Sequence, residues 1–75
     1  MTFRELCSAR FDVPFDGIEI MALYIALSGD EERLVEHQRT VLERLRAILY
    51  ENLSVEELEG LSASYARALE DGRIP

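Results

Sequence analysis

The sequence has few of the residues that form disulfides and metal sites, which stabilise many small proteins. Its 75 residues include one cysteine, one histidine and no tryptophan. A single cysteine excludes an intramolecular disulfide, and Cys7 with His37 is too small a ligand set for a closed zinc site. A chain of this length forms one small core, so regular helix packing or self-association is left to stabilise it. We expect a single helical domain over residues 1–75, without metal or cofactor.

Positive charge is also scarce. Fifteen acidic residues face eight basic ones, giving a formal net charge of -7. The basic residues are all arginine and are scattered along the chain. Nucleic-acid binding draws on clustered positive charge, so we expect no direct nucleic-acid binding. An acidic surface instead suits a protein that engages a basic partner.

Long hydrophobic runs are absent as well. The apolar run 18–27 is shorter than the roughly 20 residues that a membrane-spanning helix needs. The first ten residues, MTFRELCSAR, lack the apolar run that follows a basic region in a signal peptide. We therefore expect no membrane association and a cytoplasmic location.

What is present is a set of helix signals, beginning at the amino terminus. Thr2 and Glu5 have the spacing of a capping box, in which each side chain satisfies the other residue's backbone N–H. Pro14 disfavours helical geometry just before it, so a short helix is expected to end ahead of a turn. Three apolar side chains are expected to hold this turn against the core: Phe11, Val13 and Phe15.

Three longer helices follow in the pattern. One is expected at 18–28, with Gly29 as a left-handed C-cap. A second, about 30–52 and capped by Asp30 or by Ser28 with Glu31, has its apolar residues on one broad stripe. The last runs from a capping box at Ser54 to Gly72. The predicted fold is all-α: a small bundle of three main helices plus a short N-terminal helix.

The segment GIEIMALYIALSG, residues 17–29, carries only one charged residue, Glu19. A helix that is apolar on all sides must be covered on all sides, and three other helices are too few to do so. We therefore predict a homodimer. Gln38, a polar residue within the apolar stripe of the next helix, either fixes register in helix association or reaches solvent along the edge of the stripe. The predicted self-association residues are Ile20, Leu23, Tyr24, Leu27 and Gln38.

Catalytic constellations are missing from the pattern. Cys7 and His37 are the only candidates for a nucleophile and its base. Cys7, however, shares the apolar side of its helix with Phe3 and Leu6, which predicts a buried structural cysteine. The acidic clusters at 30–32 and 56–57 lie at helix starts, where the helix dipole favours negative charge. We expect no enzymatic activity.

Tyr50 projects away from the apolar stripe of its helix, and exposed tyrosines are enriched in interface cores. Charged residues on the same side and at the next helix start complete a predicted docking patch. The predicted partner-binding residues are Arg39, Glu43, Arg46, Tyr50, Glu56 and Glu57.

Residues 50–69, YENLSVEELEGLSASYARAL, resemble the Hha/YmoA group of small bacterial modulators. The resemblance lies in three dipeptides, Tyr50-Glu51, Leu53-Ser54 and Glu57-Leu58. It covers about a quarter of the chain and transfers no functional residue.

These patterns predict a small acidic non-catalytic protein–protein interaction module that acts as a regulator, adaptor or inhibitor of a macromolecular partner. One instance is a phage or mobile-element protein that inhibits host machinery. Two alternatives stay open. One is a structural assembly subunit. The other is a nucleic-acid mimic that occupies a basic groove with carboxylates, namely those of Asp30, Glu31, Glu32, Glu36, Glu56, Glu57 and Glu59.

Overall fold

The structure is a computed structural model that describes residues 1–74, and every regular element in that range is a helix. The predicted all-α class is confirmed. A 3₁₀ turn, η1, separates the second and third α-helices. The elements are α1 (Phe3–Ser8), α2 (Gly17–Ser28), η1 (Glu31–Arg33), α3 (Glu36–Asn52), α4 (Val55–Glu59) and α5 (Leu61–Glu70).

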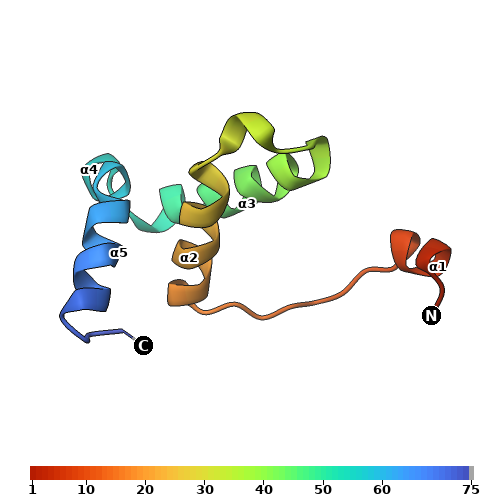
Figure 1. Cartoon of the computed structure of the whole chain (residues 1–75), viewed down its shortest axis with the longest axis horizontal. Coiled ribbons are helices and arrows are strands. Elements are labelled where there is room, and N and C mark those ends of the chain that lie inside the picture. The colour runs from red at the N-terminus through yellow and green to blue at the C-terminus, as the bar shows by residue number, and fades with distance from the viewer. Residues whose placement is uncertain (75) are drawn as a thin grey trace.

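These elements form two regions (Figure 1). Helices α2 to α5 pack together, whereas α1 lies apart at the far end of an extended segment. We call residues 1–16 the arm and residues 17–74 the body. The arm stretches the molecule to 43 × 26 × 23 Å, with a radius of gyration of 14.5 Å. A compact chain of this length has a radius of gyration of about 11 Å.

The core of the body is built on α3. Residues 42, 45 and 49 are three or four positions apart, so their side chains share one helix face. α2 lies against α3 and α5, and α4 lies against α3 and α5. Partly buried side chains of α2, among them Ile20 and Tyr24, pack against a cluster formed by α3, α4 and α5. The buried core residues are Leu42, Leu45, Leu49, Leu58 and Leu61.

Capping boxes begin three of the α-helices. The two predicted from sequence, Thr2 with Glu5 and Ser54 with Glu57, are both confirmed. A third, which the sequence reasoning overlooked, begins α2. There the Asp16 carboxylate accepts a hydrogen bond from the Glu19 N–H at 2.8 Å, and the Glu19 carboxylate accepts one from the Asp16 N–H at 3.0 Å.

The long helix begins later than predicted. Asp30 makes no side-chain capping bond, and the chain passes through η1 and an extended Leu34 before α3 starts at Glu36. The reason lies in Gln38, whose side-chain oxygen accepts a hydrogen bond from the Val35 N–H at 3.0 Å. This bond satisfies a backbone donor at the start of α3 and fixes the helix start there.

Glycines shape the other boundaries. Gly60, with φ -93° and ψ 8°, interrupts the predicted last helix and divides it into α4 and α5. Gly72, with φ +71°, takes the left-handed conformation that follows the last helix. The prediction of a left-handed Gly29 is wrong, because this residue keeps right-handed helical geometry with φ -64°.

The expectation that the turn around Pro14 packs on the core is also wrong. Phe11, Val13 and Phe15 are 64%, 60% and 45% exposed. No residue of α1 is buried, and Cys7 is exposed rather than structural. The physical reason is that Pro14 holds its predecessor in extended geometry and that Asp16, the N-cap of α2, is extended as well. The chain therefore leaves the body instead of turning back over it.

Candidate interaction surfaces

The self-association residues predicted on α2 divide between core and surface. Ile20 and Tyr24 pack against the core cluster, and Leu27 is half-buried. Leu23 is exposed. No residue of α2 is fully buried, which agrees with the expectation that its own chain cannot cover this helix completely. Gln38 lies elsewhere, at the start of α3, where its side chain serves as a cap.

The predicted partner-binding residues on α3 are largely engaged within the chain. Arg46 binds the carboxylates of Glu31 at 2.8 Å and Glu43 at 2.6 Å. Its guanidinium carbon lies 5.8 Å from the centre of the Tyr24 ring, which is within cation–π range. The Glu31 carboxylate above all, and then the Tyr24 side chain, raise the pKa of Arg46 above its ordinary value. Arg46 therefore holds the α2–η1 connection against α3.

Arg39 has a similar structural role. Its guanidinium donates to the backbone carbonyls of Glu31 at 3.4 Å and Leu34 at 3.3 Å, where the chain passes from η1 to α3. Arg39 and Glu43 also line a groove of about 430 Å³ along α3. Its other lining residues are Glu36, Thr40, Arg44 and Ala47.

Tyr50 and Glu56 are the predicted partner-binding residues that stay free for a partner. Tyr50 is 55% exposed near the end of α3. Glu56 is exposed in the first turn of α4. Glu57 is the capping-box partner of Ser54, accepting from its N–H at 3.1 Å. The docking patch is thereby reduced to an aromatic and an acidic side chain on consecutive helices.

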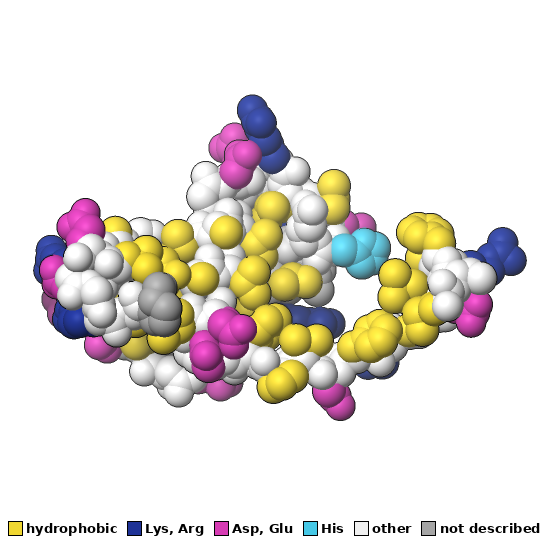
Figure 2. Space-filling model, turned by 60° about the horizontal axis from the view of Figure 1, so that its bottom comes forward, with side chains coloured by type: hydrophobic (Ala, Val, Ile, Leu, Met, Phe, Trp, Pro, Cys, Tyr) yellow, Lys and Arg dark blue, Asp and Glu magenta, His cyan; other side chains and the backbone are white. Residues whose placement is uncertain are grey.

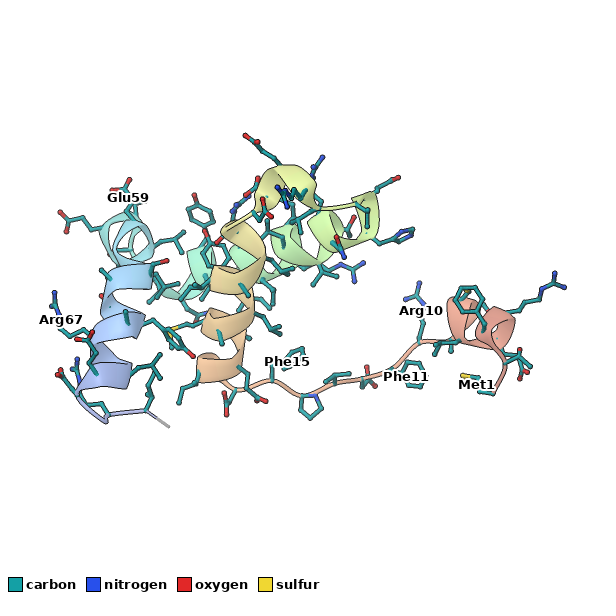
Figure 3. All side chains as sticks on the ribbon, viewed as in Figure 1. Met1, Arg10, Phe11, Phe15, Glu59 and Arg67 are labelled. Carbon is teal, nitrogen blue, oxygen red and sulfur yellow. The ribbon has the colours of Figure 1, made fainter. Side chains whose placement is uncertain are left out.

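The arm is the feature that sequence reasoning missed as an interaction surface. Its apolar side chains follow the whole segment, and Figure 2 shows hydrophobic atoms along it, with open space between it and the body. In Figure 3 the labelled Phe11 ring stands on the extended segment away from the helices. The available signal was the alternation of Phe11, Val13 and Phe15 with polar residues or proline, which is typical of extended chain. The exposed apolar residues of the arm are Met1, Phe3, Leu6, Phe11, Val13 and Phe15.

A small apolar groove lies where α2 meets α3. It has a volume of about 200 Å³. We call it the α2–α3 groove. Gly17 stands at its edge, so the groove lies close to the point where the arm joins the body. The remaining lining residues are Ile20, Met21, Ile48, Leu49, Asn52 and Leu53.

The two side chains considered for catalysis lie on different helices. Cys7 is exposed on α1 and His37 is exposed on α3. Across residues 1–74, no group of three or more His, Cys, Asp and Glu side chains is placed to hold a metal ion. Over the same residues, no helix has the length and apolar character to cross a membrane.

The chain matches no protein-family model, no curated protein and no solved structure. The resemblance of residues 50–69 to the Hha/YmoA group therefore rests on its three dipeptides alone.

Proposed function

We propose that this protein is a non-catalytic interaction module that acts as a regulator, adaptor or inhibitor, forms a homodimer and binds a protein partner. The observation that carries the proposal is the arm, whose six large apolar side chains are all exposed. Contiguous apolar surface of this kind marks sites of association. The dispersed positions of Cys7 and His37 support a role without catalysis.

For the heterologous partner, the surface that fits best is the one around Tyr50. A tyrosine offers a large contact area and a hydroxyl group at low entropic cost. Tyr50 is exposed, and no hydrogen bond within residues 1–74 engages its side chain. Glu56 adds negative charge on the following helix, which suits a partner with a basic surface.

The nucleic-acid mimic draws less support, because several of the carboxylates it needs are already engaged. Asp30 pairs with Arg33 at 3.6 Å. The Glu31 carboxylate is bound to Arg46, and the Glu57 carboxylate accepts a hydrogen bond from the Ser54 N–H. A mimic requires an ordered array of carboxylates that face outward. Those of Glu32, Glu36, Glu56 and Glu59 are exposed on three elements of the body, since Glu32 lies in η1, Glu36 begins α3 and the other two share α4.

The test is capture of the products of neighbouring genes by tagged wild-type protein and by Tyr50→Ala. The matched control is Val55→Ala, which also truncates an exposed side chain, at the start of α4. We expect one partner in fixed stoichiometry with wild type and control, and at least tenfold less with Tyr50→Ala, about 1.4 kcal/mol of binding energy.

Equal recovery of that partner with all three proteins would contradict the role of Tyr50. Recovery of this chain alone would favour the structural assembly subunit. Binding that collapses between low and moderate salt would favour the mimic, since exposed charge pairs are screened.

A further inference from the structure

The chain exposes much more surface than its mass requires. Its accessible surface is 6309 Å², whereas a compact monomer of 8.6 kDa exposes about 4,700 Å². The excess of roughly 1,600 Å² per chain exceeds the ~800 Å² that each partner contributes to a standard protein–protein interface. An association that covers the arm is therefore large enough to hold a stable dimer.

The same chain provides both an apolar projection and an apolar recess. The projection is the arm, on which Phe3 is 82% exposed. The recess is the α2–α3 groove, and the half-exposed Ile48 lies on its wall. One wall belongs to α2, none of whose residues is fully buried. A segment bound in this groove would cover part of the surface of α2 that its own chain leaves exposed.

The arm is poorly placed to fill its own groove. The groove lies next to Gly17, so the arm would have to reverse direction directly before α2. The capping box of Asp16 with Glu19 fixes the extended conformation of Asp16 directly before α2. Pro14 adds a further constraint on the backbone. The arm of a second copy can enter the groove without this reversal of the chain.

Charge also favours the exchange over side-by-side contact of two bodies. The body carries six arginines and twelve acidic residues, whereas the arm carries two arginines, three acids and the amino terminus and is therefore close to neutral. An arm docked on a partner adds no net negative charge to the acidic body, and its two arginines, Arg4 and Arg10, can face the carboxylates of that body. Two acidic bodies in direct contact would repel each other.

We infer that the protein dimerises by reciprocal arm exchange, in which Phe3, Leu6 and Phe11 of each protomer cover the α2–α3 groove of the other. The contact is two-fold symmetric, so each arm–groove pair occurs twice. The inference rests on the homodimer within the proposed function and assigns its interface to the arm instead of to Leu23 on α2.

The test is sedimentation equilibrium of full-length variants over a concentration series. Phe3→Glu with Phe11→Glu places charge on the arm, and Ile48→Glu places charge in the groove. Each is expected to raise the dimer dissociation constant at least about tenfold, since burying an unpaired charge is costly. Val55→Glu is the control, because Val55 is about as exposed as Phe11, 61% against 64%, but lies outside both surfaces; it should leave the constant unchanged. Circular dichroism verifies that each variant keeps its helices.

Mixing the two variants distinguishes exchange from other symmetric dimers. A mixed pair retains one intact arm and one intact groove, so heterodimers should form more readily than either homodimer. If the arm and groove variants dimerise like wild type while Leu23→Glu does not, arm exchange is wrong and the homodimer stands. If wild type stays at 8.6 kDa at every concentration, the homodimer itself is wrong, while capture through Tyr50 remains a separate result. Should Ile48→Glu lose its helices, Asn52→Lys at the groove replaces it.

Discussion

The arm carries six large apolar side chains in its sixteen residues, and all six are exposed. The body has five leucines at its centre, and all five are buried. A capping box precedes the first helix of each region, α1 in the arm and α2 in the body. The difference between them is that α2 and α4 both pack against α3 and against α5, whereas within residues 1–74 helix α1 lies apart from the other helices (Figure 1). Hydrophobicity makes burial favourable, but the path of the backbone decides which side chains obtain it.

The largest effect on stability is expected when a buried side chain of the body is truncated and compared with an exposed one. Leu42 is fully buried on α3, and its neighbour Val41 is 45% exposed. Leu42→Ala should lower the free energy of unfolding by about 2–5 kcal/mol, through lost burial and the cavity left behind. Val41→Ala should cost less than about 1 kcal/mol. Urea denaturation followed by circular dichroism measures both, and equal losses would contradict the assignment of the core.

A smaller effect is expected at Arg46, which ties the α2–η1 connection to α3. Arg46→Met removes its two ion pairs and its contact with Tyr24. We expect a loss of about 1–2 kcal/mol, because the guanidinium is only 25% exposed while its carboxylate partners are partly in water. Arg46→Lys should recover part of this loss, since an ammonium group lacks the planar fork that binds two carboxylates.

Arg33 supplies the matched control for that measurement. Its pair with Asp30 is 3.6 Å long and lies in solvent. Arg33→Met should therefore leave the urea midpoint unchanged. A loss as large as that of Arg46→Met would show that general charge balance, rather than the specific contacts of Arg46, stabilises the body.

The smallest effects are expected when the N-cap side chain is removed from the first helix of each region. Asp16→Ala removes the cap of α2 and should destabilise the body by about 1 kcal/mol. Thr2→Ala removes the equivalent cap of α1 but should leave the unfolding free energy of the body unchanged, because no residue of α1 is buried. The comparison is made in dilute protein, below the dimer dissociation constant. A loss with Thr2→Ala as large as with Asp16→Ala would mean that α1 packs on the body.

Much of the fold was predictable because its signals are local. The apolar spacing of α3 and the capping boxes at Thr2 and Ser54 each act within one or two turns of helix. The start of α3 was predicted six residues too early, since Asp30 also resembles a cap. The hydrogen bond from the Val35 N–H to the Gln38 side chain sets the start of α3. Gln38 therefore serves as a helix cap, whereas a role in self-association was predicted for it.

The interaction surfaces were less predictable, because they depend on contacts between elements distant in sequence. Helical spacing placed Arg46 with Tyr50 on one face, but it gave no sign that Glu31, fifteen residues earlier, would bind Arg46. The arm was mistaken for core because Phe11, Val13 and Phe15 are of the residue types found in cores. Only the three-dimensional path shows that the chain carries them away from the helices they were expected to join.

The most direct test of the account uses the single cysteine, which lies exposed on the arm. A spin label is attached to Cys7 of one protein sample, which is mixed with isotope-labelled Cys7→Ser protein. Only amides of the isotope-labelled chains, which carry no spin label, are then observed by nuclear magnetic resonance. Any line broadening therefore comes from the arm of another molecule. Arm exchange predicts selective broadening around Met21, Ile48 and Asn52. Broadening of these amides only when label and isotope share one chain would show that the arm closes on its own body, and would contradict the account.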